Sequence, residues 1–175
     1  PEHCIQWITL PSLEATNALM KHDGIATILA TGGNAMVRAA YSCGKPALGV
    51  GAGNVPAYVE KTADLRQAAH DIVMSKSFDN GMVCASEQAV IIDKEIYDDF
   101  VKELKSYYVH FINKKEKAQL EEYCFGVKAN SKDCALGKLN ADIVGRPAAW
   151  IAEQAGFSVP AGTNILAAEV SEVGE

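Results

Sequence analysis

The sequence predicts an α/β fold in which parallel sheets are wrapped by helices. Short apolar runs alternate with segments of helical periodicity along the 175 residues. Residues 25–30 form a continuous apolar run, Ile-Ala-Thr-Ile-Leu-Ala, which is typical of a strand buried on both faces. Glycine-containing segments follow this run at residues 31–34 and the next run at residues 49–54. Because parallel strands need long crossovers, usually helices, the alternation predicts parallel sheets.

In the first part of the chain, capping and turn-forming residues indicate where the helices and strands begin and end. Ser12 is a good N-cap for a helix that runs to about Lys21, and Gly44-Lys45-Pro46 ends a second helix. Apolar residues at positions 65, 68, 69, 72 and 73 recur at helical spacing. The expected elements are a strand over 5–8, a helix over 12–21, a strand over 25–30, a helix over 35–43, strands over 47–51 and 55–59, and a helix over 64–77.

The remaining elements follow from the same signals. Apolar residues from Ile96 to Leu104 mark a long helix that begins near Lys94, and Pro147 fits the first turn of another helix. The expected elements are a strand over 88–92, helices from 94 and over 115–124, a loop over 130–137, a strand over 141–144, a helix over 147–155 and a strand over 165–168.

Composition excludes some partners. The formal net charge is −6, with 49% hydrophobic and 22% charged residues, a normal balance for a soluble protein. A binder of the phosphate backbone needs clustered Lys and Arg, so we expect no nucleic-acid partner. The one basic cluster, residues 114–117, is interrupted by Glu116. We also expect no membrane partner, since no apolar run is long enough to span a bilayer and no signal peptide opens the sequence.

The cysteine pattern argues against a metal or a disulfide framework. The five cysteines are irregularly spaced and include no C-x-x-C pair. Reduced thiols in a cytoplasmic protein are the simplest explanation. None of the four histidines stands in a motif, and we assign no metal. Because the chain starts at Pro1 rather than Met and residues 169–175 end without a clear stop, we expect an excerpt from a longer protein.

Cys84 is the strongest candidate for a reactive residue. A lone cysteine is usually a small buried hydrophobe, and we expect Cys4, Cys43 and Cys124 to be packing residues and Cys134 a bystander in a polar loop. Cys84 differs because it follows the turn-forming Asp-Asn-Gly and precedes a β-prone run. A nucleophilic thiolate needs such a place, held firmly and open to substrate.

Two glycine segments are candidates for ligand contact. Thr31, Gly32 and Gly33 lie between a buried strand and a helix, whose N-terminus offers free N–H groups to a phosphate. The segment lacks the G-x-G-x-x-G pattern, and a simple turn is the commoner explanation. The second segment, residues 49–54, contains Gly51 and could equally be a tightly packed strand end.

The motif over residues 75–88 closely resembles the nucleophile segment of the CoA-acylating aldehyde dehydrogenases. The nearest match is the aldehyde dehydrogenase half of bifunctional aldehyde–alcohol dehydrogenases. The resemblance continues through residues 139–145 and 155–160, so it covers essentially the whole chain. It implies an aldehyde dehydrogenase-like fold. Residues 1–80 would be the C-terminal part of a Rossmann-type NAD-binding domain, and residues 81–175 the N-terminal part of the catalytic domain that bears the thiol.

The resemblance also implies a role for each candidate residue. Thr31, Gly32 and Gly33 match a turn that contacts NAD, and Gly51 matches a residue of the nicotinamide pocket, opposite the cysteine. Cys84 matches the nucleophile, which forms an acyl thioester, and its backbone N–H is expected to stabilise the oxyanion. The family's oxyanion asparagine and the acidic residue that binds the ribose would both lie upstream of Pro1.

The fate of the thioester separates the subfamilies. Hydrolytic members carry a glutamate that activates water, and Val50 stands at that position here. The acyl group should therefore persist until coenzyme A accepts it. Glu87 is the nearest acid in sequence to Cys84, and we expect it to be solvated or hydrogen-bonded rather than a base.

The resemblance therefore implies an NAD-dependent enzyme that interconverts acetyl-CoA and acetaldehyde in fermentation. It also implies an iron-dependent alcohol dehydrogenase half outside this chain and self-association into oligomers or filaments. A hydrolytic aldehyde dehydrogenase is the nearest alternative, and Val50 counts against it. A non-catalytic scaffold or filament element, with Cys84 a structural or redox-sensing thiol, is the alternative from another class.

Overall fold

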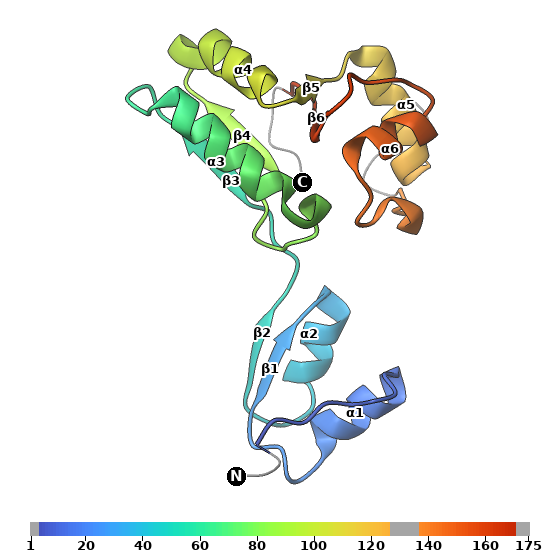
Figure 1. The fold of residues 1–175 in the computed structure, drawn as a ribbon. Helices are drawn as coiled ribbons and strands as arrows, with labels where there is room; N and C mark the ends of the chain where they lie inside the picture. The colour runs from blue at the N-terminus through green and yellow to red at the C-terminus, as the bar shows by residue number, and fades with distance from the viewer. Residues whose placement is uncertain (1–3, 127–136, 171–175) are drawn as a thin grey trace. The chain divides into compact units, whose positions relative to one another are not determined.

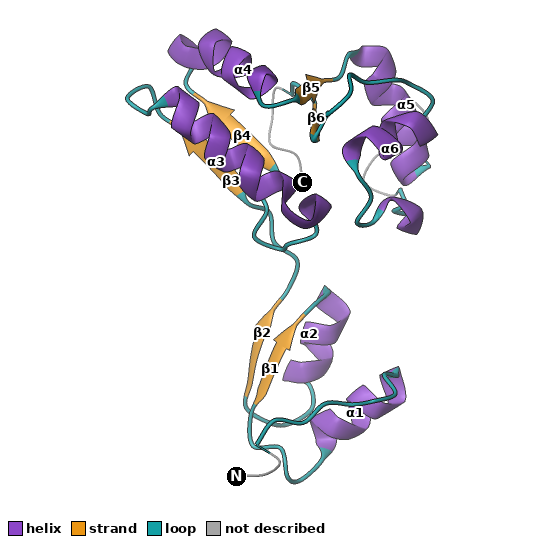
Figure 2. Ribbon diagram, in the orientation of Figure 1, coloured by secondary structure: helices purple, strands orange, loops and turns teal. Residues whose placement is uncertain are grey.

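A computed structural model describes residues 4–126 and 137–170 of the chain. The chain forms two compact units, residues 1–53 and residues 54–175, and each is described by itself. Every pair of strands among the described residues is parallel, and helices connect or flank the strands (Figures 1 and 2). The predicted α/β class with parallel sheets is thus confirmed.

The first unit is built on a strand–helix–strand motif. Helix α1 (Leu13–Lys21) begins as predicted, since the Ser12 hydroxyl accepts a hydrogen bond of 3.0 Å from the Ala15 N–H. Helix α2 (Asn34–Tyr41) then connects strand β1 (Ile28–Thr31) to strand β2 (Ala47–Val50). The strands pair in register from Ile28 with Ala47 to Thr31 with Val50. A small core lies beneath the helices and contains Met20, Ala30 and Ala40.

Two expectations for this unit are wrong. Residues 5–8 form no strand, and Ile5 and Trp7 are exposed. Strand β1 is not buried on both faces, because alternate residues of a strand point to opposite sides and only one side is covered here. Ala30 faces the core, whereas Leu29 is 78% exposed. The continuous apolar run therefore predicts the strand correctly, but only one of its two faces is buried within the described chain.

The second unit begins with another parallel motif. Strand β3 (Pro56–Val59) pairs with strand β4 (Ala89–Ile92) in parallel, and helix α3 (Leu65–Ser77) lies between them in sequence. Asp64 caps α3 by accepting a hydrogen bond of 3.0 Å from the Gln67 N–H. The core of this unit centres on the fully buried Phe100. Its other buried members are Val59, Ala69, Val73, Leu104 and Val109.

The rest of the second unit adds helices and a third strand pair. A short 3₁₀ segment, η2 (Lys94–Ile96), leads into α4 (Tyr97–Ser106), which packs against α3. Asn113 and Glu116 form a capping box at the start of α5. The remaining elements are β5 (Val109–Phe111), α5 (Lys114–Phe125), η4 (Ala141–Ile143), α6 (Ala148–Gln154) and β6 (Ile165–Ala167), and β5 pairs with β6.

Two elements of this unit differ from expectation. Strand β5 was not predicted, because three residues directly after a helix show too little periodicity. Residues 141–144 were expected to be a strand, but Ala141–Ile143 is a 3₁₀ turn. The Asn140 side chain accepts a hydrogen bond from the Asp142 N–H and starts that turn. Nearly all of the loop expected over 130–137 lies outside the described residues.

The division into a cofactor domain over residues 1–80 and a catalytic domain over residues 81–175 stays a prediction. Strands β3 and β4 lie on either side of that boundary and pair with each other. The compact units divide instead between Gly53 and Asn54. Within the described residues, every helix is too short or too polar to span a bilayer.

Phe100→Ala tests the core of the second unit. Truncating a fully buried phenylalanine removes its packing and leaves a cavity, so we expect the free energy of unfolding of this unit to fall by about 3–5 kcal/mol. Amide hydrogen exchange of α3 and α4 in the full-length protein measures the loss locally. Phe125→Ala is the control, because Phe125 is 44% exposed and should cost clearly less. Equal losses in the two variants would contradict this assignment of the core.

Candidate functional site

A run of left-handed residues reverses the chain after α3. The segment η1 (Phe78–Gly81) contains Asp79 at φ 50° and Asn80 at φ 52°, followed by Gly81 at φ 76°. Residues other than glycine rarely adopt this left-handed backbone conformation, and Asn and Asp tolerate it best. The Asn80 amide also donates a hydrogen bond of 2.9 Å to the carbonyl of Gly145, far along the chain. The predicted Asp-Asn-Gly turn is therefore present and anchored by a tertiary contact.

Cys84 lies in the next turn, which is held at both ends. The Ser86 N–H donates to the carbonyl of Val83 at 2.9 Å and closes a turn around Cys84. The Gln88 N–H donates to the carbonyl of Val55 at 2.9 Å, where β4 begins beside β3. The Cys84 side chain is exposed, and its N–H donates no hydrogen bond to another described residue. The thiol is thus accessible on a fixed turn, next to an N–H that is free to donate.

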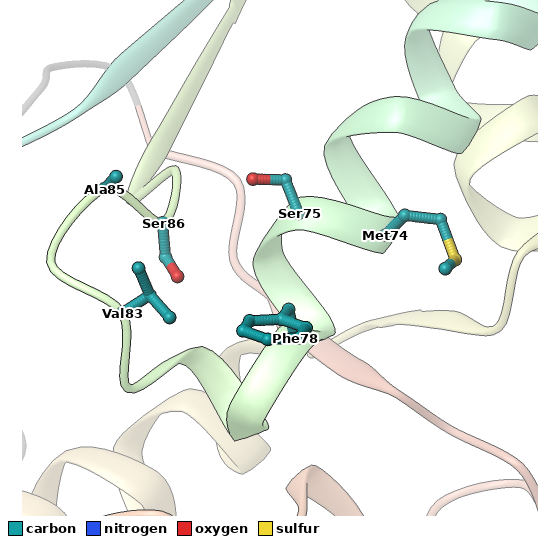
Figure 3. A pocket seen from close by; sticks show the side chains of 6 residues that line it. All are labelled: Met74, Ser75, Phe78, Val83, Ala85 and Ser86. Atoms are coloured by element: carbon teal, nitrogen blue, oxygen red, sulfur yellow. The ribbon is translucent and has the colours of Figure 1, made fainter.

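A small pocket lies beside this turn, between the loop and α3. Its volume is about 280 Å³, and Figure 3 shows the side chains that line it. Val83 and Ala85, the neighbours of Cys84 in sequence, both contribute to the wall. The complete lining is Met74, Ser75, Phe78, Val83, Ala85 and Ser86. The sequence analysis singled out the motif over residues 75–88 but did not indicate that its residues line a pocket.

Two polar atoms after Cys84 are buried without partners. The Ser86 hydroxyl and Oε2 of Glu87 have no hydrogen-bond partner among the described residues. The expectation that Glu87 is solvated or hydrogen-bonded is therefore wrong for this oxygen. No signal in the sequence indicated the burial of Ser86, because serine is mostly exposed in proteins.

The other described thiols have different surroundings. Cys124 is buried, and desolvation raises the pKa of its thiol. Cys43 is half-buried and its Sγ donates to the carbonyl of Ala40. Cys4 was expected to be a packing residue, but it is exposed. Cys134 lies outside the described residues.

The glycine segments meet at the carboxyl edge of the β1–β2 pair. The Gly32 N–H donates to the carbonyl of Val50 at 3.1 Å, which brings the Thr31-Gly32-Gly33 turn next to the end of β2. Oδ1 of Asn34, the first residue of α2, lies 2.8 Å from the point that a Cβ on Gly51 would occupy. A side chain at position 51 would have to displace the Asn34 amide, which is exposed and can move.

The start of α2 has the features of an anion site. Gly33 is the N-cap residue, and no side chain caps this end of the helix. The first N–H groups of a helix lack internal partners and carry a partial positive charge. No atom lies within 4 Å of a Cβ built on Gly33, so the space before the helix is open. These residues fit the phosphate of a dinucleotide.

Two further observations limit the chemical groups that each unit can supply. Val50, at the end of β2, is 60% exposed and apolar, so it supplies no base. Among residues 4–126 and 137–170, no three His, Cys, Asp or Glu side chains gather as metal ligands. The glycine edge and the Cys84 turn belong to different units, and the structure describes each within its own unit.

Comparison with known proteins points to one family. Residues 1–126 match the model of the aldehyde dehydrogenase family. The chain is 83% identical over all of its 175 residues to an aldehyde-alcohol dehydrogenase of Streptococcus pneumoniae serotype 4. It spans 20% of the length of that relative. The resemblance to bifunctional aldehyde–alcohol dehydrogenases is thereby confirmed.

Solved structures agree with the sequence comparison. An acetylating aldehyde dehydrogenase from Geobacillus thermoglucosidasius superposes with a TM-score of 0.86 at 45% identity, covering 99% of this chain and 36% of that one. A propionaldehyde dehydrogenase from Rhodopseudomonas palustris, with bound CoA and an acylated cysteine, gives a TM-score of 0.79 at 37% identity, covering 91% of this chain and 35% of that one. The fold is thus aldehyde dehydrogenase-like, and the chain belongs to the aldehyde dehydrogenase family.

Proposed function

We propose that the protein containing this chain is an NAD-dependent, CoA-acylating aldehyde dehydrogenase that interconverts acetyl-CoA and acetaldehyde. The observation that carries the proposal is the Cys84 turn, which holds an exposed thiol beside a free N–H and a small pocket. The names of the similar proteins support the same chemistry, since one is an acetylating aldehyde dehydrogenase and another holds CoA and an acylated cysteine.

Cys84 acts as the nucleophile in this proposal. Its thiolate sulfur adds to the aldehyde carbon, and the carbonyl electrons move to the oxygen. The Cys84 N–H, which has no other partner among the described residues, donates to that oxyanion. Bound NAD would supply the hydride acceptor for this carbon. The carbonyl re-forms, and the acyl group remains on Cys84 as a thioester.

The glycine edge of the first unit is the proposed cofactor site. Thr31, Gly32 and Gly33 lead into an uncapped helix end, where the backbone N–H groups can bind the pyrophosphate of NAD. Gly51 lies beside the same helix end, next to Asn34, and is proposed to contact the nicotinamide. The NAD role rests on family membership together with this local fit.

Because position 50 carries no base, CoA rather than water is the proposed acceptor of the acyl group. Val50 cannot take a proton from water, so hydrolysis of the thioester is unassisted from that position. The CoA thiolate instead attacks the acyl carbon, and the bond from that carbon to Cys84 breaks. Cys84 leaves as a thiolate, ready for the next turnover, and acyl-CoA is released.

The full-length protein is proposed to contain further parts. Its 83% identity to an aldehyde-alcohol dehydrogenase supports a second, iron-dependent alcohol dehydrogenase half and a fermentative role. Self-association into oligomers or filaments is proposed by the same likeness. A cytoplasmic location is proposed from the free thiols of Cys4, Cys43, Cys84 and Cys124.

Cys84→Ser in the full-length protein should abolish aldehyde oxidation and leave NAD binding intact. A hydroxyl is a far weaker nucleophile than a thiolate, so kcat should fall by several orders of magnitude, on the order of 10³ or more. Turnover is followed by NADH absorbance and NAD affinity by titration. Cys4→Ser is the control, since it removes another exposed thiol and should retain activity. Near-normal turnover by a folded Cys84→Ser protein would exclude the assignment.

Gly33→Val should weaken NAD binding more than it weakens the fold. The backbone at Gly33 has φ −65° and ψ 160°, which other residues adopt readily, and a Cβ there meets no atom within 4 Å. The added side chain would occupy the space in front of the helix N-terminus. NAD titration and a thermal melt measure the two effects, and Gly33→Ala should give a smaller loss of affinity. Unchanged affinity with a large loss of stability would show that Gly33 is only a structural turn residue.

Without CoA, aldehyde and NAD should give a burst of NADH and then a very slow phase. The burst reports the thioester on Cys84, and the slow phase reports its unassisted hydrolysis. Stopped-flow absorbance measures both, and adding CoA should restore turnover and yield acyl-CoA. Rapid steady production of free acid without CoA would instead favour a hydrolytic enzyme. Absence of a burst in a folded, NAD-binding protein would favour the non-catalytic alternative.

A further inference from the structure

The chain that leads into Cys84 is tied to a distant segment at one point. The Asn80 amide nitrogen donates a hydrogen bond of 2.9 Å to the carbonyl of Gly145, 65 residues further along the chain. Within the described residues, no other hydrogen bond joins residues 78–83 to a segment outside α3 and this turn. After Cys84, the bond from the Gln88 N–H to Val55 fixes the chain at the start of β4. The position of Cys84 therefore depends on the Asn80 bond at one end and on the sheet at the other.

The Gly145 carbonyl is itself held by a second turn. Gly145 has a left-handed backbone with φ 72°, a conformation that glycine adopts readily. Before it, the Asn140 N–H donates to the carbonyl of Cys124 at 2.8 Å, at the end of α5. After it, the Arg146 N–H donates to the carbonyl of Ile143 at 3.1 Å. Because Cys124 is buried, the Gly145 turn is attached to a packed part of the unit.

A second contact with Gly145 lies closer to the thiol. Met82, two residues before Cys84, has its Cγ and Sδ atoms 3.7 Å from the point that a Cβ on Gly145 would occupy. The Asn80 bond and this approach place the Gly145 turn beside the residues that lead into Cys84. A shift of either turn relative to the other would therefore move the backbone of Cys84.

The proposed reaction is sensitive to such a shift. The sulfur of Cys84 must meet the carbonyl carbon while the Cys84 N–H meets the oxygen of the same carbonyl. Both groups belong to one residue, so a movement of its backbone displaces them together. A misplacement of about 1 Å can cost about 10²-fold in rate. One neutral, exposed hydrogen bond contributes little to overall stability, so its loss should affect the rate more than the folding.

We infer that Asn80 is a positioning residue for the acylation of Cys84 and that the Gly145 carbonyl is its anchor. Asn80 touches neither substrate nor cofactor here, and it acts only through the turn. This inference rests on the proposed function and deepens it, since it gives the segment before α6 a role in the rate of the reaction. Breaking the bond should leave the thiol reactive by itself while its alignment with a bound carbonyl is lost.

Two substitutions in the full-length protein remove the bond without straining the turn. Asn80→Gly removes the amide, and glycine adopts the left-handed backbone freely. Asn80→Asp keeps nearly the same shape, but a carboxylate cannot donate to the Gly145 carbonyl. The burst of NADH with acetaldehyde and NAD, in the absence of CoA, measures formation of the thioester on Cys84. Its rate should fall by about tenfold to a hundredfold in both variants.

Two readouts distinguish positioning from a merely structural role. Iodoacetamide alkylates an accessible thiolate and needs no bound carbonyl, so its rate at Cys84 should stay within about threefold of the wild-type rate. Mass spectrometry of the peptide that contains Cys84 follows this reaction. The affinity for NAD, measured by titration, and the midpoint of a thermal melt should also stay nearly unchanged.

Asp79→Gly is the matched control. Asp79 has a left-handed backbone at φ 50°, like its neighbour Asn80, but its side chain makes no hydrogen bond to a described residue. The two glycine variants therefore make the same change to the backbone, and only Asn80→Gly removes the bond to Gly145. The burst rate of Asp79→Gly should fall clearly less.

The outcomes separate this inference from the proposed function. Equal losses of burst rate in the two glycine variants, or an unchanged burst in both Asn80 variants, would overturn the inference. A joint loss of alkylation rate, NAD affinity and thermal stability, or failure of both Asn80 variants to fold, would show that the contact is only structural and would overturn it as well. All of these results leave the acylating reaction of the wild-type protein in place. Absence of a burst from the folded wild-type protein would instead overturn the proposed function.

Discussion

The parallel pairing of β3 with β4 is the constraint on which the Cys84 site depends. A parallel pair requires the chain to return to the same end of the sheet, and α3 provides that return. After α3, the chain must still turn sharply to enter β4. The left-handed residues from Asp79 to Gly81 make that turn, and the bond from Asn80 to Gly145 holds it. Cys84 is placed by this reversal rather than by any contact of its own side chain.

The stretch after Cys84 departs from the rule that buried polar groups are paired. Most of the second unit follows that rule, with caps at Asp64 and Asn113 and a bond from the Gln88 N–H to Val55. Ser86 and Glu87 do not follow it. Local conflicts of this kind are expected at functional sites, where a protein gives up some stability for recognition or chemistry. The two unpaired groups lie two and three residues after Cys84, the candidate nucleophile.

The two glycine segments differ in how closely other side chains approach them. The exposed Asn34 side chain lies where a Cβ on Gly51 would be, so a substitution at 51 needs that amide to move. Gly33 has no such neighbour and an ordinary backbone conformation, so packing does not explain it. Packing and backbone conformation do not require glycine at 33, and the open space there is available to a ligand. The proposed NAD role draws its strongest local support from Gly33.

The sequence by itself determined the α/β class, most helices and strands, and the choice of Cys84 among the thiols. These features depend on short-range signals, such as the Ser12 and Asp64 caps, apolar periodicity and the Asp-Asn-Gly turn, which act within a few residues. Only the tertiary structure decided the exposure of Leu29, the strand β5, and the burial of Ser86 and Glu87. Burial depends on which distant elements cover a residue, and β5 pairs with a strand far along the chain. No local pattern carries that information, because it arises when separate elements pack together.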